Sequence, residues 1–568
     1  MAELSYDKFI LFGDSITQFS CAQDGGYGLT PALQELYVRK LDVINRGFSG
    51  YNSDHARLIL PKILEAESNE EKNNIKLMTI FFGTNDAFQV EDELNNVQAV
   101  PLDRYKKNLS AMIELALEYN IDPIVIGPAL HYDELARVGL KERGRPSDKP
   151  RVTNKRYLEY SECAEVVADK YEVAFVDSWN AFRTAGGWTK EQVFNYQNTE
   201  GLRDFFHDGV HFTPQAYQVL TTEILDAINF TPFVPELVPD KFKTWEDVRL
   251  DDLPDSMLTS NNGHLVPPKH RHALSYDKFI MLGDSITQFS SNQTGPSFGL
   301  MPALQNEYIR RLDVLNRGYA GYYSEMGKHL LRKILRAELN STKDNIKLLT
   351  IFFGTNDAFQ INDDLSEIQS IPLERYKQNL SEMIEMALEN NISPIIIGPT
   401  FHDTERAYKF FHAQGREVNS PAATHKRYYE YSEGAKEVAT KYNVAFVDLW
   451  NAFRIDGGWS KEQLLSGNEK AGPGRVRDYI SDGIHFKPLA YAIAYEEIMK
   501  AIRAHYPKLA PEKLPEKLSY WADIDPNDVE YTLFKPQNPD SPSKQVEIID
   551  TSALKEKART MIGQCFEE

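Results

Sequence analysis

Two serines stand where a hydroxyl group could act as a nucleophile. Ser15 ends the motif Gly-Asp-Ser directly after the apolar run Phe9–Phe12, and Ser285 ends the same motif after a second such run. A serine hydroxyl becomes an effective nucleophile only when a base removes its proton and donor groups stabilise the oxyanion that forms. Each serine therefore requires a histidine, a carboxylate and hydrogen-bond donors close to it in the fold.

Both halves of the chain contain an Asp-x-x-His motif late in the sequence. Asp208 and His211 stand just before an expected helix, and Asp482 and His485 take the same place in the second half. An aspartate and a histidine three residues apart on one turn can share a hydrogen bond, which leaves the other ring nitrogen for a serine. The pattern predicts one Ser-His-Asp set in each half.

Candidate donors for an oxyanion follow two other apolar runs. Asn85, in Gly-Thr-Asn-Asp, offers a side-chain amide, and the segment NRGFSG offers the backbone N–H of Gly47 or Gly50. The N–H of Ser15, at the start of a helix, is a third donor. The residues alone do not separate Gly47 from Gly50.

A long internal repeat organises the chain. The segment SYDKFILFGDSITQFS at Ser5–Ser20 returns as SYDKFIMLGDSITQFS at Ser275–Ser290, and IKLMTIFFGTNDAFQ at Ile75–Gln89 returns as IKLLTIFFGTNDAFQ at Ile346–Gln360. A unit of this length is a whole domain rather than a solenoid repeat, and 568 residues are enough for two. We predict a first domain at 1–258, a linker at 259–273, a second domain at 274–525 and a C-terminal tail at 526–568.

Short apolar runs alternate with helical patterns within each unit. The stretch Tyr105–Tyr119 is an example of the helical pattern. It places five apolar residues on one predicted face: Leu109, Met112, Ile113, Ala116 and Leu117. Five apolar runs between helices are typical of a parallel sheet covered on both faces. The sequence therefore predicts an α/β fold built as two tandem three-layer α/β/α sandwiches.

Phe230–Asp255 and Pro507–Asp525 are interpreted as arms that close the domains.

The order of the motifs resembles the four-block signature of the GDSL esterases, also called SGNH hydrolases. That order is Gly-Asp-Ser, then Gly, then Gly-x-Asn-Asp, then Asp-x-x-His. Within the family, the segments DKFILFGDSIT, NRGFSGY, TIFFGTNDA, PIVIGP, DGVHF and the Trp-containing arm are most similar to fungal isoamyl acetate-hydrolysing esterases. The resemblance implies a flavodoxin-like fold with a five-stranded parallel sheet of order 2-1-3-4-5. The doubling of the unit departs from the family.

The resemblance also implies roles for particular residues. Ser15 would be the nucleophile, His211 the general base and Asp208 its orienting partner. Gly50, the last glycine of its block, and Asn85 would form the oxyanion hole. The corresponding residues of the second unit are Ser285, His485, Asp482, Gly321 and Asn356.

Four further residues are candidates for the walls of the two pockets. Phe88 and Phe359 come just after the Asn-Asp blocks, so we expect them to shape an acyl pocket. His131 and His402 end the fourth apolar run, where the family requires no histidine. We expect these two histidines to line the pocket or form hydrogen bonds rather than to act as a second base.

The remaining signals bear on metals, partners and location. His207 and His211 have the spacing of metal ligands, but Ser481 replaces the former in the second half, so we expect no metal and no cofactor. The formal net charge of −20 argues against nucleic acid and anionic membranes as partners. Three unmatched cysteines (Cys21, Cys163, Cys565), no apolar run of spanning length and no apparent signal peptide predict a cytoplasmic protein without a membrane span.

We therefore expect a serine esterase that hydrolyses small carboxylic esters through an acyl-enzyme at two complete sites. The choice of acetate-type esters rests on the resemblance alone. One alternative is an acyltransferase that passes the acyl group to an alcohol. Another makes one half a structural partner that stabilises the other through a pseudo-two-fold interface. We expect the two domains to form an intramolecular pseudo-dimer.

Overall fold

The computed structural model describes most of both repeats. The described residues are 6–22, 26–69, 74–89, 98–142, 150–249, 252–259, 274–291, 298–340, 342–359, 369–413, 415, 423–468, 470 and 472–534. Residues 6–259 are called the first half below and residues 274–534 the second half. Most of the predicted linker at 259–273, and the predicted tail beyond residue 534, lie outside the described residues.

A five-stranded parallel sheet lies at the centre of each half. The strand order is β2-β1-β3-β4-β5 in the first half and β7-β6-β8-β9-β10 in the second, which confirms the predicted order 2-1-3-4-5. The strands are β1 (Asp7–Gly13), β2 (Leu41–Gly47), β3 (Ile75–Phe81), β4 (Asp122–Ile126), β5 (Ala174–Val176), β6 (Asp277–Gly283), β7 (Leu312–Gly318), β8 (Ile346–Phe352), β9 (Ser393–Ile397) and β10 (Ala445–Val447).

Helices surround both sheets. Those of the first half are α1 (Ser15–Gln18), α2 (Leu29–Tyr37), α3 (Ser53–Glu67), α5 (Leu102–Glu118), α6 (Asp133–Glu142), α7 (Asn154–Lys170), α8 (Ser178–Ala185), α9 (Lys190–Asn195), α10 (Pro214–Ile228) and α11 (Leu253–Ser256). Those of the second half are α12 (Ser285–Gln288), α13 (Leu300–Tyr308), α14 (Ser324–Glu338), α16 (Leu373–Glu389), α17 (Thr404–Ala413), α18 (His425–Lys441), α19 (Leu449–Asp456), α20 (Lys461–Leu465), α21 (Pro488–His505) and α22 (Val529–Leu533).

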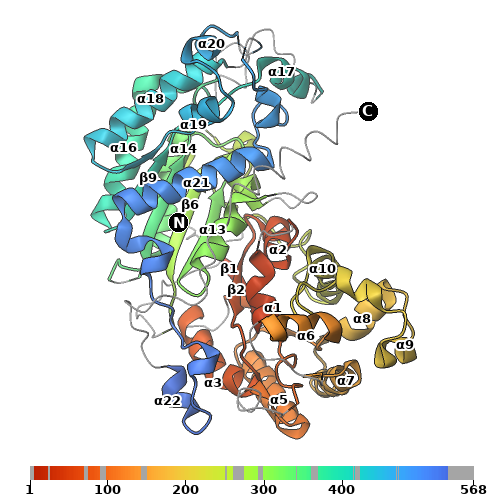
Figure 1. Ribbon diagram of the computed structural model, residues 1–568. Helices are drawn as coiled ribbons and strands as arrows, with labels where there is room; N and C mark the ends of the chain where they lie inside the picture. The colour runs from red at the N-terminus through yellow and green to blue at the C-terminus, as the bar shows by residue number, and fades with distance from the viewer. Residues whose placement is uncertain are drawn as a thin grey trace.

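The helices form a layer on each face of each sheet, as the three-layer prediction requires. In the first half, α3, α5 and α7 pack side by side on one face, and α2, α10 and α8 pack on the other (Figure 1). In the second half, α14, α16 and α18 form one layer, and α13, α21 and α19 form the other. Each half is therefore an α/β/α sandwich with its own hydrophobic core.

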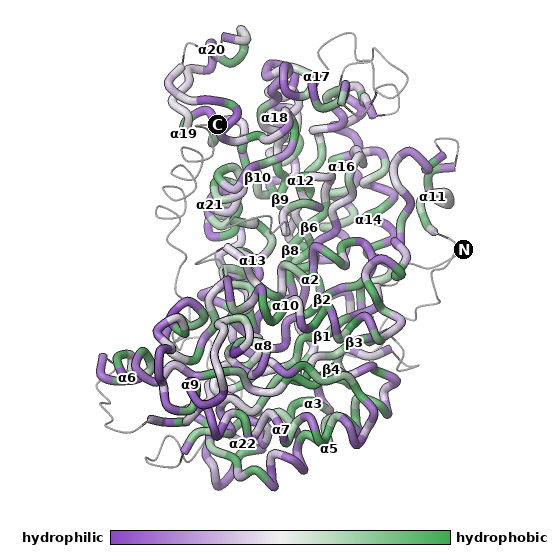
Figure 2. The backbone as a smooth tube through the Cα atoms, turned by 90° about the vertical axis from the view of Figure 1, so that its right-hand side faces the viewer, coloured by the Kyte–Doolittle hydropathy of each residue, from purple (hydrophilic) through white to green (hydrophobic). Residues whose placement is uncertain are grey.

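The apolar patterns explain which faces are buried. The central strands β1 and β3 are mostly hydrophobic and buried, whereas outer helices such as α5 alternate in hydropathy (Figure 2). Helix α5 buries four residues of the predicted face: Leu109, Met112, Ile113 and Ala116. The prediction was wrong for Leu117, which is 41% exposed because it lies at the edge of that face, about 80° round the helix from Leu109.

The parallel register aligns the carboxyl ends of the central strands. Gly13, at the end of β1, pairs with Gly47 at the end of β2 and with Phe81 at the end of β3. The segments that follow these three strands therefore leave the sheet at the same edge. Ligand sites of open parallel sheets lie at this edge, beside the point where the strand order reverses.

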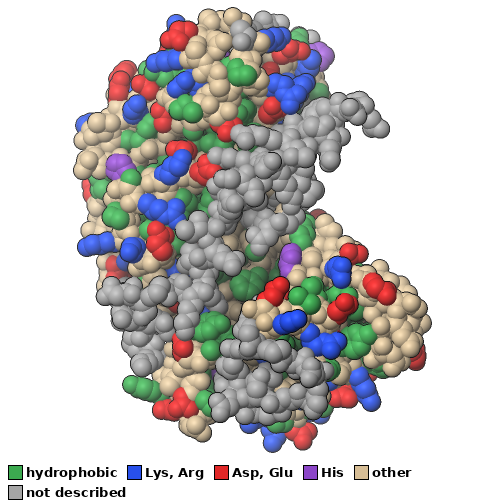
Figure 3. Space-filling view, in the orientation of Figure 1, with side chains coloured by type: hydrophobic (Ala, Val, Ile, Leu, Met, Phe, Trp, Pro, Cys, Tyr) green, Lys and Arg blue, Asp and Glu red, His purple; other side chains and the backbone are tan. Residues whose placement is uncertain are grey.

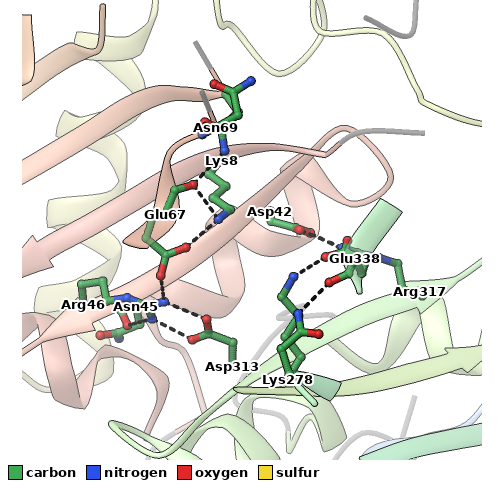
Figure 4. A network of polar contacts seen from close by, with 12 residues as sticks. Lys8, Asp42, Asn45, Arg46, Glu67, Asn69, Lys278, Asp313, Arg317 and Glu338 are labelled. Atoms are coloured by element: carbon green, nitrogen blue, oxygen red, sulfur yellow. Dashed lines mark hydrogen bonds and ion pairs between the residues drawn. The ribbon is translucent and has the colours of Figure 1, made fainter. Parts of the chain in front are cut away.

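Two reciprocal ion pairs join the halves. Arg46 in β2 binds both carboxylate oxygens of Asp313 in β7 at 2.7 Å, and Arg317 in β7 binds those of Asp42 in β2 at 2.7 and 2.8 Å (Figure 4). Both arginines are buried, and Arg46 also pairs with Glu67 of its own half. Bidentate geometry fixes orientation as well as distance, so these pairs set how the two edge strands face each other.

The first arm crosses from one half to the other. Its start lies on its own half, where the Tyr37 hydroxyl donates a hydrogen bond to the carbonyl of Phe233. Further along, Phe242 and Met257 are fully buried in the hydrophobic core of the second half. The arm therefore closes its own domain only in its first part.

The second arm crosses in the opposite direction. The Tyr308 hydroxyl holds the carbonyl of Leu509 within the second half, but Leu518 and Leu533 are fully buried in the core of the first half. Helix α22 accordingly lies beside α3, away from the rest of the second half (Figure 1). The prediction that each arm closes its own domain was wrong for the far part of both arms.

The surface charges and the helix lengths bear on possible partners and on membrane crossing. Acidic and basic side chains are interspersed over the face drawn in Figure 3. Within the described ranges, none of the helices combines the length and the apolar character that a bilayer crossing requires.

The reciprocal ion pairs predict a matched pair of stability losses. We expect Asp313→Asn and Asp42→Asn each to lower the free energy of unfolding by about 3 kcal/mol, because each leaves a buried arginine without its partner in the other half. Urea unfolding measures the loss. The exposed Asp103→Asn serves as the control, and losses no larger than that of the control would contradict this role.

Candidate active site

A short hairpin loop presents the Asp-x-x-His motif in the first half. Phe206 and Phe212 form an antiparallel bridge that closes the loop, and Gly209 turns it with a φ of +89°. The Asp208 carboxylate accepts hydrogen bonds from the His211 N–H at 2.9 Å and the Val210 N–H at 3.1 Å. The motif therefore forms a turn whose own backbone orients the aspartate.

The structure brings the three residues of the predicted Ser-His-Asp set together. The His211 Nδ1–H donates to Asp208 Oδ2 at 2.8 Å, and Ser15 Oγ lies 2.9 Å from His211 Nε2. Burial acts to raise the pKa of Asp208, but hydrogen bonds from the side chain and backbone of His211 outweigh it and lower the pKa. A carboxylate that stays ionised holds the proton on Nδ1, which leaves Nε2 as an acceptor for the serine hydroxyl.

The second half repeats this arrangement. His485 Nδ1 lies 2.6 Å from Asp482 Oδ2, and His485 Nε2 lies 2.9 Å from Ser285 Oγ. The same balance of burial against hydrogen bonds from His485 lowers the pKa of Asp482. Both serines are almost completely buried, while each Asp-His pair keeps about a quarter of its side-chain surface exposed.

The helix that begins at Ser15 leaves backbone donors available. Asp14 caps this helix by accepting a hydrogen bond from the Ile16 N–H, and burial raises the pKa of Asp14 to about 7. The N–H of Ser15 lies in the first turn, where no carbonyl of the helix can accept it. It is therefore available to a ligand at the edge of the sheet.

Gly47 and Gly50 have different surroundings. The Gly47 N–H donates to Asn45 Oδ1 at 2.9 Å, and a Cβ on Gly47 would lie 2.0 Å from the backbone nitrogen of Gln18. Gly50 has a φ of +77°, and its N–H has no acceptor among the described residues. Gly47 thus permits close packing against α1, while Gly50 leaves its N–H open. Gly321 of the second half has a φ of +78°.

Asn85 and a glutamine absent from the sequence prediction complete this edge. Asn85 Nδ2 donates one hydrogen to the carbonyl of Tyr51 at 2.8 Å, which leaves its second hydrogen available. Gln98 Nε2 lies 3.3 Å from Asn85 Oδ1 and 3.2 Å from the carbonyl of Gly50, so it links the two residues. In the second half, Asn356 donates to the carbonyl of Tyr322 at 2.7 Å, and Gln369 to that of Gly321 at 2.8 Å.

Comparison with known proteins identifies the family. The model of the GDSL-like lipase/acylhydrolase family matches the chain twice, at residues 11–219 and 281–493. The chain belongs to this family. The resemblance deduced from the motifs is therefore confirmed, and the chain is a carboxylic ester hydrolase that carries the GDSL unit in tandem.

Each of the following known proteins matches about one unit of this chain over nearly its own whole length. The isoamyl acetate-hydrolyzing esterase of Saccharomyces cerevisiae is 34% identical over 258 residues, which are 44% of this chain and 96% of that protein. The isoamyl acetate-hydrolyzing esterase 1 homolog of Rattus norvegicus is 32% identical over 267 residues, 46% of this chain and 96% of its own. A crystal structure of the lipase/acylhydrolase from Enterococcus faecalis covers 40% of this chain and 96% of its own at 21% identity, with a TM-score of 0.28.

The four predicted pocket residues of this GDSL chain lie in the interior. The Arg151 guanidinium stands 4.3 Å from the ring centre of Phe88, and Phe359 is also buried. His131 and His402 are 1% exposed, and their ring nitrogens form no hydrogen bond with a described residue. Burial lowers the pKa of His402 to about 3. The structure does not bring either histidine into the Ser-His-Asp sets.

Other residues of the GDSL unit contact the site without having been predicted. Gln18 Oε1 accepts the Ser49 N–H at 2.8 Å and so holds the loop that carries Gly50, and the ring of Phe19 packs edge-on against His211. Both belong to the repeated segment GDSITQF, whose identity in the two halves was the available signal. Gln98 recurs as Gln369, at the start of the matching segments QAVPLDRYK and QSIPLERYK, so the repeat was an available signal for it as well.

Gln98 provides a test of how the predicted oxyanion donors, Gly50 and Asn85, are positioned. In a Ser285→Ala background, we expect Gln98→Leu to lower kcat of ester hydrolysis about tenfold or more with little change in KM, because the donors lose the group that holds them. Gln369→Leu in the same background is the control, since it alters only the disabled site. Equal rates for the two variants would contradict a positioning role for Gln98.

Proposed function

We propose that the chain is a serine esterase that hydrolyses small acetate-type esters through an acyl-enzyme, at one site in each half. The observation that carries this proposal is the hydrogen-bonded series from Asp through His to Ser, formed in both halves with serine-to-histidine distances of 2.9 Å. These serines lie at the edge of the sheet where the backbone donors are open. The domains proposed at 1–258 and 274–525 would form a pseudo-dimer.

The first chemical step follows from the Ser15 site. Ser15 Oγ attacks the ester carbonyl carbon while its proton passes to His211 Nε2, and Asp208 stabilises the imidazolium that forms. The negative charge that develops on the carbonyl oxygen is met by the N–H of Ser15, the N–H of Gly50 and the free amide hydrogen of Asn85. These donors are fixed before the reaction, so little reorganisation accompanies the charge.

The remaining steps use the same groups. The tetrahedral intermediate collapses, the alkoxide takes the proton from His211 Nε2, and the alcohol departs. Water then loses a proton to Nε2 as it attacks the acyl group on Ser15. The second collapse releases the acid and returns the proton to the serine oxygen. The Ser285 site would follow the same course with His485 and Asp482.

The substrate class draws on the relatives. The Saccharomyces cerevisiae and Rattus norvegicus proteins are named for the hydrolysis of isoamyl acetate, and each matches one unit over nearly its whole length. This favours acetates of medium-chain alcohols as substrates.

The matching geometry of the two halves favours two working sites over a catalytic half with a structural partner.

Serine substitutions test whether both sites work. We expect Ser15→Ala and Ser285→Ala each to leave part of the hydrolysis of an acetate ester, and the double variant to lose about 10³-fold or more, because each change removes one nucleophile only. Initial rates with the p-nitrophenyl ester measure this. If either single change removes all activity, the two-site proposal fails.

Added alcohol separates hydrolysis from acyl transfer. With a medium-chain alcohol present, we expect the free acid to remain the main product, since water reaches the acyl-enzyme. Chromatographic product analysis measures the ratio. A new ester in excess of free acid would contradict the hydrolase and support an acyltransferase.

A further inference from the structure

The arm of each half delivers a tryptophan to the serine site of the other half. Trp521, from the second arm, packs on Gly50 of the first half. A Cβ on Gly50 would lie 2.1 Å from Trp521 Cδ1, so the indole rests directly on this glycine. In the same way, a Cβ on Gly321 of the second half would lie 1.8 Å from Cδ1 of Trp245, which belongs to the first arm.

Hydrogen bonds lock the second arm in this position. The Tyr51 hydroxyl of the first half donates to the carbonyl of Ser519 at 2.7 Å. Arg310 Nη2 donates to the carbonyls of Leu518 and Ser519 at 3.0 and 3.2 Å. The segment before Trp521 is therefore held on both sides, and Leu518 is fully buried in the first half.

The first arm is held by equivalent contacts. The Tyr322 hydroxyl of the second half donates to the carbonyl of Lys243 at 2.9 Å, and Arg39 Nη2 donates to the carbonyls of Phe242 and Lys243. The Phe242 ring packs edge-on against Tyr319. Both tryptophans begin a short 3₁₀ turn, so the two crossings are equivalent in conformation as well as in contacts.

Tyr51 connects the arm to the proposed oxyanion hole. Its hydroxyl binds the arm of the other half, and its carbonyl accepts the hydrogen bond from Asn85 Nδ2. Tyr322 repeats both contacts, with Lys243 and with Asn356. The residue that receives the arm is thus the residue that orients the amide donor.

From this placement we propose that Trp521 and Trp245 are specificity-determining residues that act across the halves, each forming an apolar wall of the other half's ester site. The inference rests on the proposed function. A carbonyl oxygen bound by the Gly50 N–H lies about 3 Å from that nitrogen. Because the Trp521 indole also touches Gly50, the alkyl chain of a bound ester lies beside the indole. Both indoles are only half-buried, which leaves surface for a substrate.

The chemistry of an indole indicates which esters it would help the site to bind and hydrolyse. A flat aromatic surface binds alkyl chains by burying apolar area, and each methylene in an apolar pocket changes kcat/KM by about tenfold or more. Esters with a medium-length alkyl chain therefore benefit from the wall, whereas an ester with a one- or two-carbon chain gains little. The exchanged tryptophan would set the chain-length preference of each site.

The test isolates the first site in the full-length chain. In a Ser285→Ala background, Trp521→Ala should lower kcat/KM for hexyl acetate about tenfold or more and leave ethyl acetate much less affected. Trp245→Ala in the same background is the matched control, because its indole lies at the disabled site, and both esters should stay within about twofold. Trp521→Phe should restore most of the hexyl acetate activity.

The mirrored background exchanges the roles of the two residues. With Ser15→Ala as parent, Trp245→Ala should reduce the preference for hexyl acetate, and Trp521→Ala should be neutral. An equal fall in kcat/KM for both esters, or equal effects of Trp521→Ala and its control, would overturn the inference. The comparison of two esters on one variant holds even if that variant is less stable. A Ser285→Ala parent without ester turnover contradicts the proposed function instead, and the mirrored background then decides the inference at the other site.

Discussion

The contact between His211 Nε2 and Ser15 Oγ is the constraint on which the architecture of the first half depends. The two residues are 196 positions apart in the chain, yet their atoms lie 2.9 Å apart. The parallel sheet makes this possible, because every strand ends at the same edge and each following strand brings the chain back to that edge. The aligned ends of β1, β2 and β3 add the loops of Gly50 and Asn85. The second half meets the same constraint with the same topology.

The doubled chain uses its two copies as parts of one structure. The Arg46–Asp313 and Arg317–Asp42 pairs orient the edge strands β2 and β7 toward each other. The crossed arms then bury Phe242 in one core. Exchange of this kind between identical chains produces domain-swapped dimers, and here the partners are joined in one chain.

Much of the fold and most of the site could be predicted from the sequence. The alternation of apolar runs with helical patterns indicated the layers, and the repeated motifs indicated the Ser-His-Asp sets. The strand order came from the resemblance to the family that these motifs carry. Each of these is a local pattern with a strong physical requirement behind it. A serine, an aspartate and a histidine of this kind have few other reasons to recur together at matching positions.

The parts that could not be predicted depend on contacts between distant segments. Gly47 and Gly50 look alike in the sequence, but in the fold Asn45 Oδ1 accepts the Gly47 N–H, whereas Gly50 has a positive φ and an N–H without an acceptor among the described residues. The apolar residues of the arms indicate burial but not which core receives them, so Trp521 gave no sign that it packs on Gly50. Gln98 likewise gains its importance only from the two groups that it joins in space.

The number of reactive serines per chain is the most direct test of this account. A p-nitrophenyl phosphonate reacts with an activated serine, which displaces p-nitrophenolate and keeps the phosphonyl group, and intact mass spectrometry counts the groups added. Two phosphonyl groups per chain, at Ser15 and Ser285, are expected, with one remaining after either Ser→Ala change. A wild-type chain that accepts one group or none, at saturating reagent, would contradict the claim that both serines are activated by their histidines.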